Sequence, residues 1–202
     1  MSRKQHWERI YQTKDSAQLS WFERQPAVSL RLIEAASLTV GACILDVGGG
    51  TSTLVDSLLE RGYHPGVLDV SAAAVGMSQT RLGPRAVQVE WFVADVTEFR
   101  SPHVWDLWHD RAVFHFLTDK TEQLAYKKAL LQTLGENAQV VLGVFGPQGP
   151  RKCSGLDVCR YDAASLQDRL GSDFKLLQHE LVEHTTPQGI TQQFLFCRFQ
   201  RV

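Results

Sequence analysis

Apolar residues follow two alternating patterns along the 202-residue chain. Short, mostly apolar stretches between turn residues are typical of strands buried on both faces. They occur at 44–47, 66–69, 87–94, 105–109 and 139–145. Apolar residues three or four positions apart indicate helices. These occur at 28–36, 54–59, 72–82 and 119–134. Strands and helices that alternate in this way predict an α/β fold, with a doubly wound sheet of mostly parallel strands.

The C-terminal part of the chain has a different pattern. Polar and apolar residues alternate at 174–182 and 192–199, and the turn-rich sequence TTPQG joins the two stretches. A period of two predicts half-buried strands, here an antiparallel hairpin that completes a seven-stranded sheet at its edge. A chain of this length forms one domain with a substantial core. We therefore expect a single domain over 1–202.

The segment 44–71 reads as strand, glycine-rich turn, helix and second strand. Three consecutive glycines let the backbone turn sharply and leave no side chain in a ligand's way. They are Gly48, Gly49 and Gly50. Thr51 or Ser52 can cap the helix that follows, and Gly62 ends it. This arrangement predicts a Rossmann-like nucleotide-binding βαβ unit.

Two ligands compete for this unit. The glycines, with Asp69 at the end of the second strand, also fit a dinucleotide site in which the acid holds a ribose hydroxyl. However, Asp46 precedes the glycines, where it would repel a pyrophosphate, and Thr53 stands in place of the third glycine of that fingerprint. A ligand without phosphates, carrying an ammonium group and a ribose diol, fits these acids better. S-adenosyl-L-methionine is such a ligand.

Four stretches resemble the motifs of class I S-adenosylmethionine-dependent methyltransferases. They are DVGGGTS, LDVS, VADVTEF and WDLWHDRAVFHFL, in that order, and the last is similar to thiopurine- and tellurite-type and some protein-lysine members. Ser52 stands where the family more often has glycine. Since the family also ends in two antiparallel strands, the resemblance spans the chain. It implies a cofactor core at 40–146, acceptor-side loops and the hairpin at 147–202, and a set of cofactor-binding residues. These are Asp46, Gly48, Gly49, Gly50, Thr51, Asp69, Val70, Asp95, Val96, Arg111 and Trp21.

Residues 1–24 are rich in aromatic side chains. Trp7 and Tyr11 are four positions apart and share a face if the segment is helical, and Trp21 follows. The segment either packs on the sheet edge or forms a lid that excludes water from the site. The resemblance favours the lid, since related enzymes begin with a similar aromatic segment.

The candidate bases follow the fourth predicted strand. Methyl transfer from a sulfonium is an in-line displacement that needs mainly alignment, and a base only when the acceptor arrives protonated. His109 and Asp110 are the predicted catalytic residues, because they stand where ligands bind in such folds. His115 is either a further site residue or a core-edge residue between two phenylalanines. Asp110 and Arg111 either brace each other or line the pocket, which the resemblance favours.

Four cysteines are dispersed, without ligand spacing for a metal. We therefore expect reduced thiols and no structural metal. Cys153, Cys159 and His184 lie in predicted acceptor-side loops, where they either bind a soft metalloid acceptor or have no special role. Arg160 and Tyr161 either anchor an anionic acceptor or pack the loop.

Charge balance and the polarity of the N-terminus limit the classes of binding partner that we expect. The chain carries 21 Lys and Arg against 22 Asp and Glu, so it has no electrostatic footprint for nucleic acid. The polar N-terminus predicts neither a signal peptide nor a membrane span, which favours a cytoplasmic protein. We expect a monomer or weak dimer that methylates a small molecule or a protein side chain. HDRAV stands where an NPPY-like motif would indicate methylation of amino groups on bases or glutamine. The alternative is a non-catalytic S-adenosylmethionine-binding module.

Overall fold

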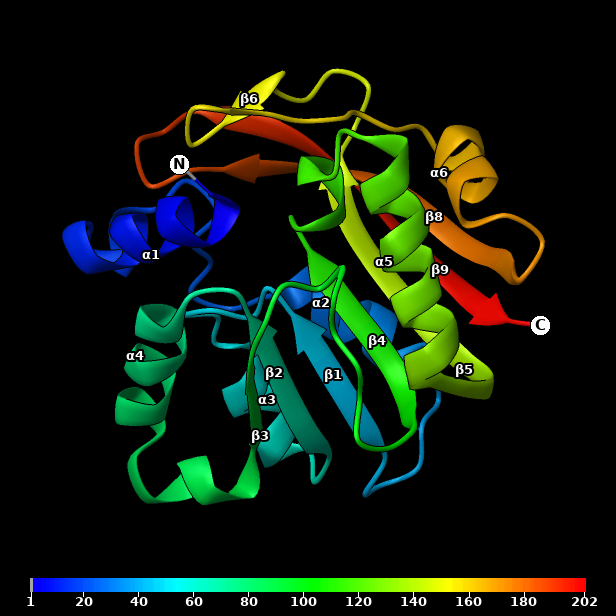
Figure 1. The fold of residues 1–202 in the computed structure, drawn as a ribbon, viewed down its shortest axis with the longest axis horizontal. Helices are drawn as coiled ribbons and strands as arrows, with labels where there is room; N and C mark the ends of the chain where they lie inside the picture. Colours follow the sequence, from blue (N-terminus) through cyan, green and yellow to red (C-terminus); the bar gives the residue numbers. More distant parts are fainter. Residues whose placement is uncertain (1) are drawn as a thin grey trace.

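A seven-stranded sheet forms the centre of the computed structural model, which describes residues 2–202 (Figure 1). The strand order is β3-β2-β1-β4-β5-β9-β8. Strands β1 to β5 are parallel, and β9 is antiparallel to both of its neighbours. The strands are β1 Cys43–Val47, β2 His64–Asp69, β3 Glu90–Val93, β4 Trp105–Arg111, β5 Leu134–Phe145, β8 Phe174–Thr185 and β9 Thr191–Arg201. The predicted mostly parallel sheet with a C-terminal antiparallel hairpin is confirmed.

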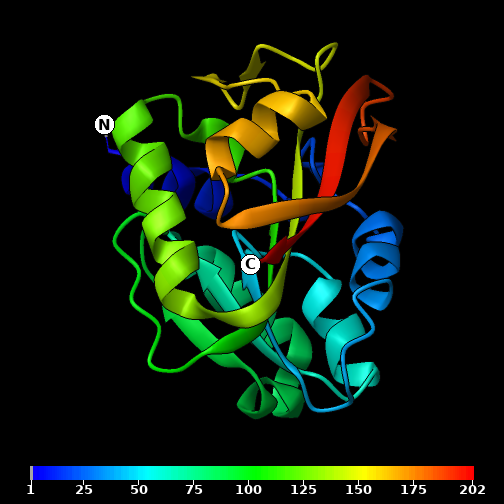
Figure 2. The same ribbon diagram turned by 90° about the vertical axis from the view of Figure 1, so that its right-hand side faces the viewer.

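Helices cover both faces of the sheet (Figure 2). On one face, α2 and α3 pack against the side chains of Ile44, Leu107 and Val141. On the other, α5 and α6 pack against those of Leu45 and Trp108 and their neighbours. The helices are α1 Arg3–Thr13, α2 Ala27–Glu34, α3 Leu54–Glu60, α4 Ala72–Leu82, α5 Lys120–Thr133 and α6 Ala163–Leu170. Because β1 and β4 are buried on both faces, their sequences are apolar runs rather than alternating ones.

Polar side chains cap the starts of three helices. The Ser71 hydroxyl accepts from the amide of Ala74 and starts α4, and the Asp119 carboxylate accepts from Thr121 and starts α5. At α3 the N-cap is Thr53, while the Ser52 hydroxyl accepts from the first helical amide, that of Leu54, at 3.1 Å. Ser52, rather than Thr51, therefore satisfies a free donor at that end.

Several boundaries differ from the prediction. Strand β3 is only four residues long, because Gly83–Gln88 forms a 3-10 turn that Pro84 favours at its start. Strand β4 continues to Arg111, so Asp110 lies within the strand and not beyond it. A two-stranded hairpin, β6 Lys152–Cys153 and β7 Leu156–Asp157, was also not expected.

Helix α6 was not predicted either, although the sequence carries its signals. Asp162 and Ser165 form a reciprocal capping box at its start, and Gly171, at φ 72°, follows its end. Leu166 and Leu170 lie one turn apart and are fully buried. These features are sufficient to predict a short amphipathic helix.

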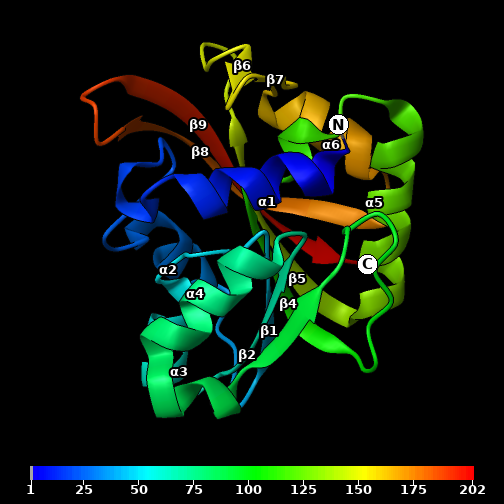
Figure 3. The ribbon, with the colours of Figure 1, turned by 60° about the vertical axis from the view of Figure 1, so that its left-hand side comes forward.

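The N-terminal segment crosses the carboxyl ends of the parallel strands (Figure 3). Helix α1 packs on α4 through Ile10, Tyr11 and Ala74. The residues after it are held by the C-terminal hairpin, because the ring of His184 contacts the carbonyl of Ser20 at 2.7 Å. Within residues 2–202, no helix is both long and apolar enough to cross a membrane.

Candidate active site

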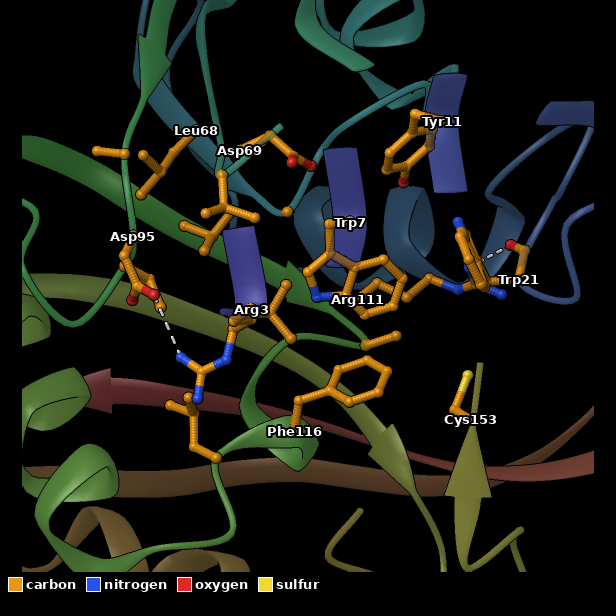
Figure 4. A pocket seen from close by; sticks show the side chains of 18 residues that line it. Arg3, Trp7, Tyr11, Trp21, Leu68, Asp69, Asp95, Arg111, Phe116 and Cys153 are labelled. Atoms are coloured by element: carbon orange, nitrogen blue, oxygen red, sulfur yellow. Dashed lines mark hydrogen bonds and ion pairs between the residues drawn. The ribbon is translucent and has the colours of Figure 1, made fainter. Parts of the chain in front are cut away.

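A cavity opens at the carboxyl ends of the parallel strands, beneath α1 (Figure 4). This is the edge of a doubly wound sheet where ligands bind. We call it the first cavity. Its walls are Arg3, Trp7, Tyr11, Trp21, Val47, Gly48, Leu68, Asp69, Val70, Ala94, Asp95, Val96, Arg111, Ala112, Val113, Phe116, Leu117 and Cys153. Most of the predicted cofactor residues thus meet around one space.

Asp69 lies at the end of β2 with one carboxylate oxygen engaged. Oδ1 accepts from the amide of Ser71 at 2.8 Å. Oδ2 faces Gly50, where a Cβ would lie 3.0 Å from it and 2.8 Å from the hydroxyl of Tyr11. Burial, with the negative charges of Asp46 and Glu8, raises the pKa of Asp69 to about 7. Hydrogen bonds from the hydroxyl groups of a ligand would therefore stabilise the ionised form of this carboxyl group.

Asp95 follows β3 and also lines the first cavity. Its Oδ1 accepts from the amide of Thr97 at 2.9 Å and from the Thr97 hydroxyl at 2.7 Å. Its Oδ2 lies 3.3 Å from Nη1 of Arg3, at the start of α1. Arg3 also forms an ion pair with Glu122. The sequence analysis did not identify Arg3, because the contact joins residues 92 positions apart.

The glycine loop lies between two cavities and cannot carry side chains. Gly48 has φ 67°, and a Cβ there would lie 2.0 Å from Cγ2 of Val113. Gly50 has φ 42°. Both backbone conformations favour glycine, and at both positions neighbouring side chains lie too close for a Cβ atom. Gly48, Gly49 and Thr51 line a second, adjoining cavity.

A buried triad of side chains forms one wall of this second cavity. His109 Nδ1 lies 2.7 Å from Oδ1 of Asp46, and His109 Nε2 lies 2.8 Å from the hydroxyl of Ser29. All three residues are at most 2% exposed. Both ring nitrogens of His109 are therefore engaged, which does not suit its predicted role as a base that meets the acceptor. Ser29, on α2, was missed because only the fold brings it near His109.

Asp110 lies in neither cavity among the described residues, which does not suit a catalytic or pocket-lining role. It is fully buried, and it accepts from the amides of Val113 and Phe114 and, at 2.6 Å, from the hydroxyl of Tyr126. Burial raises its pKa to about 6. Asp110 thus stabilises the turn after β4. It does so through these three partners and not through a pair with Arg111, which was the alternative.

His115 is also a structural residue, in agreement with the core-edge alternative. Its ring stacks on Phe145 with centroids 4.4 Å apart, and its Nδ1 accepts from the amide of the same residue. Burial, with the charge of Arg111, lowers the pKa of His115 to about 3, so the ring is neutral. It lines neither of the two cavities described above.

Arg111 joins both cavities to the N-terminal segment. Its Nη1 donates to the carbonyl of Trp21 at 2.7 Å, and its Nη2 lies 2.9 Å from Oε1 of Glu23. Its guanidinium carbon lies 5.1 Å from the centre of the Phe194 ring, a cation–π distance. A half-buried arginine held in this way fixes the segment that follows α1 against the end of β4.

Aromatic rings form the wall of the first cavity opposite the strand ends. Trp7 makes edge contacts with Phe116 and Trp21, at centroid distances of 5.0 and 5.6 Å, and Tyr11 lies 6.3 Å from Trp21. Figure 4 shows Trp7, Tyr11 and Phe116 around the same space as Asp69. Phe116, in a short 3-10 turn after β4, was not singled out from the sequence.

The acceptor-side cysteines do not come together. Cys153 lines the first cavity, but Cys159 packs near Gln123, and His184 lies against Ser20. Residues 2–202 contain no group of three or more His, Cys, Asp or Glu side chains arranged to hold a metal ion. Because these side chains lie apart, the structure gives no support to the alternative in which Cys153, Cys159 and His184 bind a soft metalloid acceptor together.

Comparison with known proteins agrees with this fold. Residues 44–135 match the family model of a methyltransferase domain. Nodulation protein S of Rhizobium tropici is 27% identical over 122 residues, which are 60% of this chain and 50% of that protein, so the chain spans about half the length of this relative. Residues 44–135 are thus similar to a methyltransferase domain.

Solved structures extend the likeness to the whole chain. The N-methyltransferase NodS of Bradyrhizobium japonicum, in complex with S-adenosylhomocysteine, has a TM-score of 0.74 at 16% identity, with 99% of each chain covered. A structure described for the conversion of a disulfide bond into a thioacetal group during echinomycin biosynthesis has a TM-score of 0.80 at 16% identity, covering 99% of this chain and 93% of that one. The predicted class I methyltransferase fold is confirmed.

Proposed function

We propose that the protein is an S-adenosylmethionine-dependent methyltransferase of the EC 2.1.1 class that acts on a small-molecule acceptor. One observation carries the proposal: Asp69 and Asp95, at the ends of neighbouring strands, both line a cavity bordered by the glycine loop. Two hydroxyls of a ribose match Asp69, and the amino group of an adenine matches Asp95. Leu68, Val70 and Val96 supply apolar walls for the base.

The residues present fit this methyl donor. A Cβ at Gly50 would lie 3.0 Å from Oδ2 of Asp69, and Oδ2 of Asp46 is buried without a hydrogen-bond partner, as expected beside a ligand cation. Arg111 offers a positive charge on both cavities. Bound there, S-adenosylmethionine would supply a methyl group already activated by its sulfonium.

The chain's own contribution is alignment and exclusion of water. Trp7, Trp21 and Phe116 wall the acceptor side, where low polarity strengthens the interactions of a charged donor. Burial raises the pKa of the Tyr11 hydroxyl far above its ordinary value and also raises that of the Cys153 thiol, so neither group is a base at neutral pH. The acceptor therefore brings its own free lone pair.

The lid position supports a small acceptor. Helix α1 and the segment after it lie over the strand ends where the first cavity opens (Figure 3), which leaves little room for a folded protein surface. Among structural neighbours, a 1,6-didemethyltoxoflavin-N1-methyltransferase and a magnesium protoporphyrin IX methyltransferase are named for small-molecule acceptors. A protein side chain is the second class of acceptor, and the activity test should include it.

Titration calorimetry tests donor binding. The protein should bind S-adenosylmethionine and S-adenosylhomocysteine but not NAD, and comparable binding of NAD would overturn the assignment. Transfer of a labelled methyl group to thiols, metalloids, small amines and lysine-bearing proteins then tests catalysis. Transfer to a small molecule supports the proposal. Binding without transfer to any acceptor would instead support the non-catalytic module.

A further inference from the structure

The carboxylate of Asp46 is unusual in being half satisfied. Its Oδ1 lies 2.7 Å from His109 Nδ1, whereas its Oδ2 is buried and has no hydrogen-bond partner. The glycine loop lies directly over this oxygen, since a Cβ on Gly49 would lie only 2.7 Å from it. An unpaired carboxylate oxygen in the interior costs free energy, which a cationic donor would recover.

Two side chains fix the orientation of this carboxylate. The Ser29 hydroxyl lies 2.8 Å from His109 Nε2 and is itself almost fully buried. If that hydroxyl donates to Nε2, the proton of the neutral ring is on Nδ1, where it donates to Asp46. The imidazole then stays in one orientation, and Oδ2 stays turned toward Gly49 and the second cavity.

We propose that Ser29 and His109 are positioning residues, which hold Asp46 so that its Oδ2 receives the ammonium group at the amino-acid end of the methyl donor. The proposal rests on the proposed function, because it takes that ligand as given. It assigns a binding role, through Asp46, to the histidine that sequence reasoning expected to act as a base. Neither Ser29 nor His109 touches the reacting atoms.

Two adenosine ligands separate this role from a purely structural one. S-adenosylhomocysteine carries the ammonium group, whereas 5′-methylthioadenosine has the same adenosine and sulfur but no amino-acid end. Asp46→Asn should weaken S-adenosylhomocysteine about tenfold or more, the loss expected for one charge-assisted hydrogen bond. Binding of 5′-methylthioadenosine should change by less than about twofold, since its contacts lie at the other acids.

Variants of the positioning residues should follow the same division. His109→Gln moves the side-chain amide away from Asp46, so the affinity for S-adenosylhomocysteine should fall by several-fold or more. His109→Asn can keep a donor near the position of Nδ1, so it should retain most of that affinity. Ser29→Ala removes only one hydroxyl and should give a smaller loss in the same direction. Thr133→Val, at a buried hydroxyl that lines neither cavity, is the control and should affect neither ligand.

Titration calorimetry with both ligands on each variant decides the matter. Retained binding of 5′-methylthioadenosine shows that a variant is folded, and Ser29→Ala carries the test if a histidine variant is not. Equal losses for both ligands, or an unchanged affinity for S-adenosylhomocysteine in His109→Gln, would overturn the positioning role alone. If the unsubstituted protein binds neither ligand, the proposed function fails, and this inference fails with it.

Discussion

Arg3 and Asp95 form an ion pair at the wall of the first cavity, with 3.3 Å between Nη1 and Oδ2. The other oxygen of Asp95 is engaged by Thr97, so Arg3 takes the only one that a ligand could use. Arg3 belongs to α1, and it also pairs with Glu122 of α5. In the free protein, the N-terminal helix therefore holds the acid that we assign to the adenine amino group.

Replacing Arg3 should tighten adenosine binding. A partly exposed ion pair is worth about 0.2–1 kcal/mol, so Arg3→Ala should raise the affinity for S-adenosylhomocysteine and 5′-methylthioadenosine by up to about fivefold. Titration calorimetry measures both. Arg9→Ala, at an exposed position of the same helix, is the matched control and should have no effect. Weaker binding in Arg3→Ala would mean that Arg3 assists the ligand instead of competing with it.

Donor affinity should rise with pH around neutrality. Ligand hydroxyls donate to an ionised Asp69, and in the free protein the pKa of this residue is about 7. The affinity for S-adenosylhomocysteine should therefore increase from pH 6 to pH 8 and then level off. Asp69→Ala should lose about tenfold or more in affinity, because charge-assisted hydrogen bonds are worth roughly 1.5–3 kcal/mol. Asp95→Ala should lose less. A rise with pH that persists in Asp69→Ala would assign the titration to another group.

The same residue should cost the free protein stability at high pH. The pKa of Asp69 rises from 3.8 to about 7 on folding, so its contribution is fully favourable below pH 4 and is lost as the pH rises through 7. Asp69→Asn, which cannot ionise, should therefore raise the melting temperature at pH 8 and change it little below pH 4. Thermal unfolding of both proteins without ligand measures this. A variant less stable than the parent at pH 8 would contradict the assignment.

Asp110 should matter for stability and not for donor binding. Its carboxylate accepts from two backbone amides and from Tyr126, whose hydroxyl also accepts from Trp108 at 2.8 Å. Tyr126→Phe leaves these buried groups incompletely paired and should cost about 1–3 kcal/mol of unfolding free energy. Denaturant unfolding gives that value. At denaturant concentrations below the unfolding transition, the affinity for S-adenosylhomocysteine should be unchanged. A loss of affinity without a loss of stability would mean that Asp110 contributes to donor binding.

The aromatic lid can be tested without removing the segment that Arg111 holds. Deleting residues 1–24 would strip both Trp21 and Glu23 from Arg111 and destabilise the protein whatever their role in catalysis. Trp7→Ala is milder, and it opens the wall beside Phe116. Turnover should fall much more than donor affinity, as kcat and the dissociation constant for S-adenosylhomocysteine will show. Trp91→Ala, outside both cavities, is the control. A destabilised but fully active Trp7→Ala protein would favour simple packing.

The residues that could be predicted share one property: their role depends on neighbours along the chain. The glycine loop, Asp69 and Asp95 each follow directly from a strand end, and the structure places them around one pair of cavities. Burial on both faces also made β1 and β4 recognisable as apolar runs. For these elements local sequence was sufficient.

The residues that could not be predicted depend on contacts between distant segments. Ser29 meets His109 across 80 positions, and Arg3 meets Asp95 across 92. His109 and Asp110 were correctly placed near the end of β4, but their sequence does not reveal which groups surround each side chain. Helix α6 is different, because Asp162 and Gly171 do mark its ends.

The contact between Ser20 and His184 has a consequence for the order in which the protein is made. These residues are 164 positions apart, so the segment that carries Trp21 and Glu23 lacks one of its anchors until the hairpin of β8 and β9 has formed. A nascent chain that has folded only β1 to β5 has the glycine loop, Asp46, Asp69 and Asp95, and Arg111 can hold the N-terminal segment at β4, but the second anchor is missing. Assembly of the fully closed site is therefore a late step in folding, because it requires a contact between segments far apart in the sequence.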